Sequence, residues 1–136
     1  MNRVEVKRIS YYPPSKGFIV LLKEKNGDRQ LQILVKSHKA QAIARYFEGA
    51  KMYRPMIHDV VIDIVENLDA KINKVLISHI DVNKKYYTQI EINNSQSGNI
   101  LIETRPSDAI AISLRNLVPI YISDEVMDYE NIDNIV

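Results

Sequence analysis

The segment from residue 17 to residue 35 most constrains what this chain can fold into. Two runs of strand-forming residues, 17–24 and 29–35, flank the sequence Asn26-Gly27-Asp28. Asn-Gly is a strong signal for a two-residue hairpin turn, because both central positions of the favoured turn need a positive φ angle. The segment therefore predicts an antiparallel hairpin, and the fold must contain a β-sheet.

Alternation of apolar and polar residues predicts the remaining strands. Residues 72–80 and 86–93 alternate with a period of two, residues 100–104 form a third strand-forming run, and short polar turns separate the three. We expect these three strands to form an antiparallel meander. Residues 3–10 predict a first strand, and residues 119–122 predict a short last strand.

Two helices are predicted between the hairpin and the meander. The first follows Ser37, a candidate N-cap, and ends near Gly49. The second begins around His58. The apolar stripes that we expect to face the core are Ala40, Ile43, Ala44 and Phe47 in the first helix, and Val61, Ile64, Val65 and Leu68 in the second.

A third helix is predicted from residue 107 to residue 117, with Ser107 as its candidate N-cap. It is apolar almost all round, which is typical of a central helix. From Asp124 we expect one loose helical turn, leading into an acidic tail over residues 127–136. The expected fold is α+β: a single compact domain over residues 1–126, with a mixed, mainly antiparallel sheet, an N-terminal hairpin, a central three-strand meander and three packed helices.

Composition excludes several classes of protein. With 46% hydrophobic and 26% charged residues, the 136-residue chain has the composition of a folded globule. It has no cysteine, which excludes disulfide frameworks, zinc–thiolate sites, iron–sulfur clusters and thiol nucleophiles. The lack of cysteine suits a reducing compartment, and the sequence has neither a signal peptide nor an apolar run of about 18 residues. We therefore expect a cytoplasmic protein without a membrane anchor.

Charge is balanced over the chain but uneven along it. The net charge of +1 gives no global argument for binding nucleic acid. Between Lys36 and Arg54, however, the basic residues outnumber the single acidic residue, Glu48. If nucleic acid binds, we expect Lys39 and Lys51 of this segment to contact its phosphates.

Two similar junctions carry the candidate chemistry, Arg54-Pro-Met-Ile-His-Asp59 and Arg105-Pro-Ser-Asp108. Each places an arginine and a proline just before a helix whose first turn holds an aspartate. One interpretation is structural, because the aspartate complements the helix dipole and the arginine can tie two helix starts together. The other is a site where arginines bind phosphate oxygens, while carboxylates and an imidazole hold Mg²⁺ or move protons. The second interpretation needs both junctions in one cleft.

At these junctions the sequence resembles the bifunctional nuclease (BFN) domain family. The run Ile102-Glu-Thr-Arg-Pro-Ser-Asp-Ala-Ile-Ala, followed by Pro119-Ile-Tyr-Ile, is similar to the family's Arg-Pro-Ser-Asp-Ala-Ile-Ala helix and Pro-Ile-Tyr-Val strand. Arg54-Pro-Met-Ile-His-Asp is similar to the family's Arg-Pro-x-Thr-His-Asp, with Ile57 in place of threonine. In the first helix, Lys36 and Lys39 replace a glycine and an acidic residue of the family.

The resemblance implies a nuclease that cleaves both DNA and RNA, in a bifunctional nuclease-type domain that assembles into homo-oligomers. We predict His58, Asp59 and Asp108 as catalytic residues, with Asp59 and Asp108 holding a divalent cation such as Mg²⁺. The residues predicted to bind phosphate are Arg54, Arg105, Lys39 and Lys51. The alternative is a non-catalytic, homo-oligomeric binding or regulatory module of the same fold, in which the arginine and aspartate junctions are structural.

Overall fold

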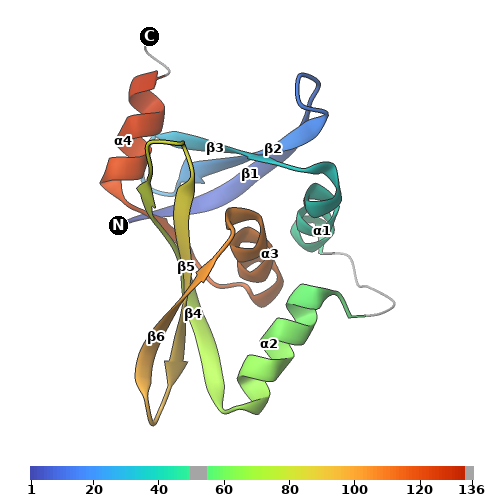
Figure 1. The fold of residues 1–136 in the computed structure, drawn as a ribbon, viewed down its shortest axis with the longest axis vertical. Helices are drawn as coiled ribbons and strands as arrows, with labels where there is room; N and C mark the ends of the chain where they lie inside the picture. Colours follow the sequence, from blue (N-terminus) through green and yellow to red (C-terminus); the bar gives the residue numbers. More distant parts are fainter. Residues whose placement is uncertain (50–54, 134–136) are drawn as a thin grey trace.

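The computed structural model describes residues 1–49 and 55–133, which form seven strands and four helices (Figure 1). In chain order these elements are β1 (Asn2–Tyr12), β2 (Gly17–Glu24), β3 (Gln30–Val35), α1 (Ser37–Glu48), α2 (Ile57–Asn67), β4 (Ala70–Ile80), β5 (Tyr86–Asn94), β6 (Gly98–Thr104), α3 (Pro106–Asn116), β7 (Ile120–Ile122) and α4 (Asp124–Asp133).

All seven strands belong to one sheet, in the order β3-β2-β1-β7-β4-β5-β6. Neighbouring strands are antiparallel except β4 and β7, which are parallel. The N-terminal hairpin β2–β3 and the meander β4–β5–β6 are both present, which confirms these two predictions. The fold is α+β with a mixed, mainly antiparallel sheet, as the sequence predicts.

The turn of the first hairpin differs from the predicted two-residue type. Neither Asn26 nor Gly27 has a positive φ angle. The strands stay paired as far as Glu24, whose N–H donates to the carbonyl of Arg29 over 3.0 Å, so four residues form the loop. The Arg29 side chain forms ion pairs with Glu24 and with two aspartates of α4. These contacts hold the base of the loop against α4.

Helix α3 lies at the centre of the molecule, where its apolar sequence predicts it. It packs against β4 and β5 on one side and against α1 and α2 on the other (Figure 1). Its buried side chains are Ser107, Ala109, Ile110, Ala111, Ile112 and Ser113. The predicted N-cap is wrong: Arg105 occupies the cap with extended backbone, and Ser107 is buried within the first turn. Pro106 suits the first position, where a backbone N–H would have no partner in the helix.

Helix α1 ends as predicted but begins one residue early. Gly49 has a φ of 73°, and its N–H donates to the carbonyls of Arg45 and Tyr46, which closes the helix C-terminus. At the other end Lys36, rather than Ser37, occupies the N-cap. Tyr46 is buried, whereas Phe47 of the predicted stripe is 42% exposed.

Helix α2 buries only half of the stripe that its spacing predicts. Val61 and Val65 are partly buried against the core, as predicted. Ile64 and Leu68 were also expected inside, but they are 55% and 68% exposed. The helix packs against α3 and β4, and its buried residues are His58 and Ile62. The side of α2 that meets the rest of the chain is therefore rotated from the centre of the predicted stripe.

The last segment is more ordered than the loose turn predicted from its sequence. Helix α4 runs over ten residues and packs against β3 and β4, which are not neighbours in the sheet. The sheet must therefore curl so that both strands reach one helix. Val126 and Met127 are fully buried. Of the helices that the structure describes, none is long and apolar enough to cross a membrane.

Candidate active site

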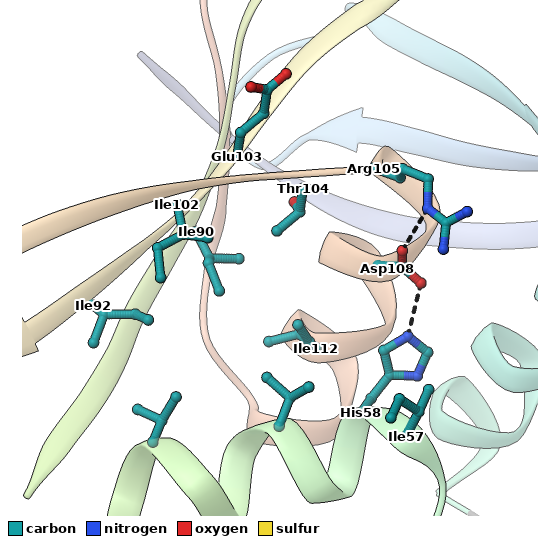
Figure 2. A pocket seen from close by; sticks show the side chains of 12 residues that line it. Ile57, His58, Ile90, Ile92, Ile102, Glu103, Thr104, Arg105, Asp108 and Ile112 are labelled. Carbon is teal, nitrogen blue, oxygen red and sulfur yellow. Dashed lines mark hydrogen bonds and ion pairs between the residues drawn. The ribbon is translucent and has the colours of Figure 1, made fainter. Parts of the chain in front are cut away.

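The two junctions meet in the fold, at the starts of α2 and α3. His58 is the second residue of α2, and Asp108 is the third residue of α3. The imidazole Nε2 of His58 lies 3.0 Å from Oδ1 of Asp108, across 50 residues of sequence (Figure 2). His58 is only 8% exposed, so this contact joins the two helices at a largely buried point.

Arg105 completes a chain of three polar side chains at this place. Its Nε–H donates to Oδ2 of Asp108 over 2.9 Å, and its side chain is 71% exposed. In Figure 2 the hydrogen bond to Asp108 starts from Nε, and no dashed line reaches the two terminal nitrogens of the guanidinium. A guanidinium has five N–H donors. Arg105 can therefore hold Asp108 through Nε–H while its terminal N–H groups bind an anion.

A cavity of about 640 Å³ lies beside this chain, between α2, α3, β5 and β6. Its lining residues are Ile57, His58, Val61, Val65, Ile90, Ile92, Ile102, Glu103, Thr104, Arg105, Asp108 and Ile112 (Figure 2). The walls are mainly aliphatic, and the polar groups gather where β6 leads into α3. The hydroxyl of Thr104 is buried there and has no hydrogen-bond partner within residues 1–49 and 55–133. A few polar groups at one end of an apolar cavity are typical of a ligand site.

Asp59 neighbours His58 in sequence, but its carboxylate binds elsewhere. Its Oδ1 accepts a hydrogen bond from Nε of Arg115 over 2.5 Å, near the C-terminus of α3. Its Oδ2 accepts one from the backbone N–H of Met56 over 2.8 Å, which satisfies the N-cap of α2. Asp59 is not among the residues that line the cavity. Its contacts are those of a residue that fixes α2 to α3.

The environment keeps both aspartates ionised. Burial opposes ionisation of Asp59, but the Met56 N–H and the Arg115 guanidinium outweigh it and hold its pKa below the ordinary value of 3.8. Burial also opposes ionisation of Asp108, but His58 and Arg105 together hold the pKa of Asp108 below 3.8. Burial and the nearby Asp59 charge raise the pKa of Tyr46 to about 12. The site thus holds two carboxylates and a neutral phenol at neutral pH.

These lowered pKa values predict acid sensitivity. A carboxylate with a lower pKa in the folded state stabilises the protein above its unfolded pKa, and this stabilisation is lost as the pH falls through the folded value. The melting temperature should therefore stay constant above about pH 5. It should decrease once the pH is lower than 3.8, which is the ordinary pKa of both groups.

The variant Asp59→Asn measures how much one carboxylate contributes to the free energy of unfolding. It should melt lower than the parent at pH 7, with a loss of about 1–3 kcal/mol, because Arg115 loses its charged partner. Its melting temperature should also fall less steeply in acid. Calorimetry from pH 2.5 to pH 7 measures both effects. An identical acid profile for the two proteins would show that the Asp59 pair contributes nothing to folding.

The two aspartates do not form a ready-made metal site. Both oxygens of Asp59 accept hydrogen bonds, and those of Asp108 contact His58 and Arg105. A guanidinium next to each carboxylate opposes a second cation there. Within residues 1–49 and 55–133, no group of three or more His, Asp or Glu side chains is arranged to hold a metal ion. The divalent cation remains a prediction from the sequence, and we assign no catalytic step to it.

The remaining residues predicted for the site are Arg54, Lys51 and Lys39. Arg54 and Lys51 fall outside the described residues. Lys39 is half-buried in the first turn of α1 and does not line the cavity. Glu103 and Thr104 also line the cavity, although neither is among the residues predicted for the site. Their position directly before Arg105, at the end of an apolar strand, is a signal that could have identified them.

The pairing with Asp108 determines what His58 can do chemically. Because Asp108 is ionised, the Nε2 atom of His58 must carry a proton to donate to it. In the neutral imidazole the lone pair is then on Nδ1. This atom is buried and has no hydrogen-bond partner among the described residues. Asp108 thus fixes the orientation and the tautomer of His58, as a carboxylate does for a histidine that transfers protons.

Comparisons with known proteins identify the family. The model of the bifunctional nuclease domain matches residues 20–134. The chain is 34% identical over 128 residues to the uncharacterized protein Rv1829 of Mycobacterium tuberculosis, covering 93% of this chain and 74% of the relative. It is 29% identical over 111 residues to bifunctional nuclease 1 of Oryza sativa subsp. japonica, covering 79% of this chain but 33% of that protein. The chain therefore belongs to the bifunctional nuclease domain family.

Proposed function

We propose that this protein is a nuclease that hydrolyses phosphodiester bonds of DNA and RNA in the cytoplasm. The observation that carries the proposal is the polar chain His58–Asp108–Arg105 at one end of a cavity. It combines a group that can transfer a proton with an exposed guanidinium that can bind phosphate. Membership of the bifunctional nuclease domain family supports the same reaction class.

Each residue has a distinct role in this proposal. Arg105 binds a non-bridging phosphate oxygen through its terminal N–H groups and neutralises charge in the transition state. His58 accepts the proton of the attacking water as the new P–O bond forms, and the leaving oxygen takes a proton from a solvent water as the ester P–O bond breaks. Asp108 holds the imidazole in one tautomer and stabilises the imidazolium.

Burial of the proton-accepting nitrogen adds a condition to this mechanism. Nδ1 of His58 is covered in the structure, so water must gain access to it before a proton can move. A base must come within hydrogen-bond distance of the proton that it removes, directly or through one water. Substrate binding at Arg105 therefore has to be accompanied by an opening of the cavity at His58.

A cleavage assay with an arginine variant tests this function. Labelled single- and double-stranded DNA and RNA are incubated with the parent and with Arg105→Gln, with and without added divalent cations. We expect the parent to cleave all four classes, because phosphate contacts do not depend on the base. Arg105→Gln should raise KM at least about ten-fold and reduce the salt slope of binding by about 1.

The matched control is Arg8→Gln. Arg8 is exposed on β1, and β7 and β4 separate β1 from β5 in the sheet. It should behave as the parent in both KM and salt dependence. Absence of cleavage by the parent under every condition, or equal effects of the two arginine variants, would contradict the assignment.

One observation favours the second candidate, a non-catalytic binding or regulatory module. Both junction aspartates are in ion pairs with arginines, Asp59 with Arg115 and Asp108 with Arg105. The Asp59–Arg115 pair joins α2 to α3 and the Asp108–Arg105 pair lies within the start of α3, so both pairs can have a purely structural role. The same assay separates the candidates, because a module would bind nucleic acid or another partner without cleaving any substrate.

A further inference from the structure

The walls of the cavity beside His58 are aliphatic. Among the described residues that line it, all seven apolar ones are isoleucine or valine, and none is aromatic. Ile90 and Ile112 are buried in its walls, whereas Ile57 and Ile102 are 67% and 44% exposed, so the cavity opens to solvent beside them. Its volume of about 640 Å³ is ordinary for a small-molecule site. These walls suit an alkyl chain better than a nucleobase, because bases bind mainly by stacking on aromatic rings.

The carboxylate of Glu103 points away from this cavity. Successive side chains of a strand point to opposite faces of the sheet. On β6, Ile102 and Thr104 therefore share one face and Glu103 lies on the other, and Figure 2 shows Glu103 directed away from both. Ile102 pairs with Ile90, which lies in the cavity wall. The negative charge of Glu103 thus lies outside the aliphatic space.

Two threonine hydroxyls on the cavity face of the sheet indicate that a ligand atom completes the polar end. Thr104 lines the cavity, and Thr88 lies directly opposite it on β5. Thr88 is fully buried, and neither hydroxyl has a hydrogen-bond partner within residues 1–49 and 55–133. A buried hydroxyl without a partner costs free energy, and each hydroxyl has a proton to donate. A hydrogen-bond acceptor on a ligand would therefore be stabilised at this end.

Arg105 supplies the positive charge at the same end. It is the only arginine or lysine among the described residues that line the cavity. Its Nε–H donates to Asp108, whose other oxygen contacts His58, so both oxygens of that carboxylate already have partners. The terminal N–H groups of the 71% exposed Arg105 side chain can bind an anion. Because Arg105 also balances the charge of Asp108, a ligand with one negative charge fits better than one with two.

We propose that the cavity binds a single-chain aliphatic carboxylate, a fatty acid of medium chain length. Its alkyl chain lies between the isoleucine and valine side chains of α2, α3, β5 and β6. Its carboxylate accepts hydrogen bonds from the terminal N–H groups of Arg105 and from the hydroxyl of Thr104. Burial of the methylene groups and the charge-assisted hydrogen bonds at the head both favour binding.

The position of the head group has a consequence for nucleic acid. The proposed nuclease uses the same N–H groups of Arg105 to bind phosphate. A bound fatty acid therefore competes with nucleic acid for Arg105, and this consequence alone rests on the proposed function. Binding of the fatty acid itself can be measured without nucleic acid, so the two proposals can fail separately.

Calorimetric titration with octanoate, decanoate and dodecanoate tests the proposal, at concentrations below those at which they form micelles. The Kd should fall about two- to four-fold for each added methylene, because each buries further apolar surface. Arg105→Gln should raise the Kd of decanoate about five-fold, because the carboxylate loses its cation. It should leave the Kd of decanol unchanged, because the hydroxyl head of decanol carries no charge.

A pair of substitutions on β6 tests whether the chain lies in the cavity. Ile102→Gln places a polar group in the wall and should raise the Kd of decanoate about five-fold. Leu101→Gln is the matched control. Leu101 is 52% exposed, close to the 44% of Ile102, but it lies on the opposite face of the same strand. It should bind decanoate as the parent does, and circular dichroism should show that both variants are folded.

Three results would overturn the proposal. They are no binding of any of the three carboxylates, equal effects of Ile102→Gln and Leu101→Gln, and equal effects of Arg105→Gln on decanoate and decanol. The last result would mean that a neutral apolar ligand occupies the cavity. Absence of binding together with self-association in light scattering would mean that a second copy of the chain covers it. None of these measurements depends on nuclease activity.

Discussion

Ile110→Asp is expected to leave no soluble, folded protein. Ile110 is completely buried in the middle of α3, the helix that packs against β4, β5, α1 and α2. An aspartate there removes apolar contacts and buries a carboxylate with no cation to pair with. Together these losses exceed about 5 kcal/mol, whereas the whole free energy of unfolding of an ordinary domain is about 5–15 kcal/mol. The variant should appear only in the insoluble fraction.

Val82→Asp provides the matched control for this prediction. Val82 is 98% exposed between β4 and β5, so the same substitution there buries nothing. It should be as soluble as the parent and should melt within a few degrees of it. Expression, solubility and circular dichroism of the two variants measure the difference. A soluble Ile110→Asp with unchanged melting would show that α3 is not the centre of the fold.

The sequence predicts an element best when its apolar residues leave no choice about which side of the element is buried. In β5 the residues Thr88, Ile90 and Ile92 alternate with polar ones, and all three are buried as predicted. Helix α3 is apolar nearly all round, so it can lie only in the core. In both cases the local pattern and the tertiary position agree, and no choice between faces remains.

The predictions fail where the position depends on a partner distant in sequence. Helix α2 has a clear apolar stripe, but packing against α3 and β4 buries His58 and Ile62 most deeply and leaves Ile64 exposed. The hairpin has a four-residue loop instead of a two-residue turn, and Arg29 at its base binds two aspartates of α4 that lie far away in the sequence. Helix α4 itself has a mainly acidic sequence, and its order comes from burying Val126 and Met127 against the sheet.

The candidate site, too, could be predicted only in part from the sequence. The motifs at residues 54–59 and 105–108 mark the two helix starts, but they cannot show that these starts touch. That information lies in how α2 crosses α3. The crossing brings His58 to Asp108, while the neighbouring Asp59 reaches Arg115, seven residues further along α3. Two adjacent residues thus have different surroundings, which no motif could distinguish.

His58→Gln is expected to abolish cleavage while preserving the fold. The glutamine amide can still donate a hydrogen bond to Asp108, so the contact between α2 and α3 survives. It cannot accept a proton from water, and loss of general acid–base catalysis by one side chain lowers a rate by about 10²–10⁴. KM should change little, because Arg105 still binds phosphate. The melting temperature should stay close to that of the parent.

The most direct test of the central claim is the rate of cleavage of one labelled oligonucleotide by the parent, His58→Gln and His38→Gln, purified identically. His38 is exposed on α1 and does not line the cavity, so it is the matched histidine control. The account predicts equal rates for the parent and His38→Gln, and a rate at least about 100-fold lower for His58→Gln. Equal rates in all three preparations would contradict it, because the activity would then not come from this site.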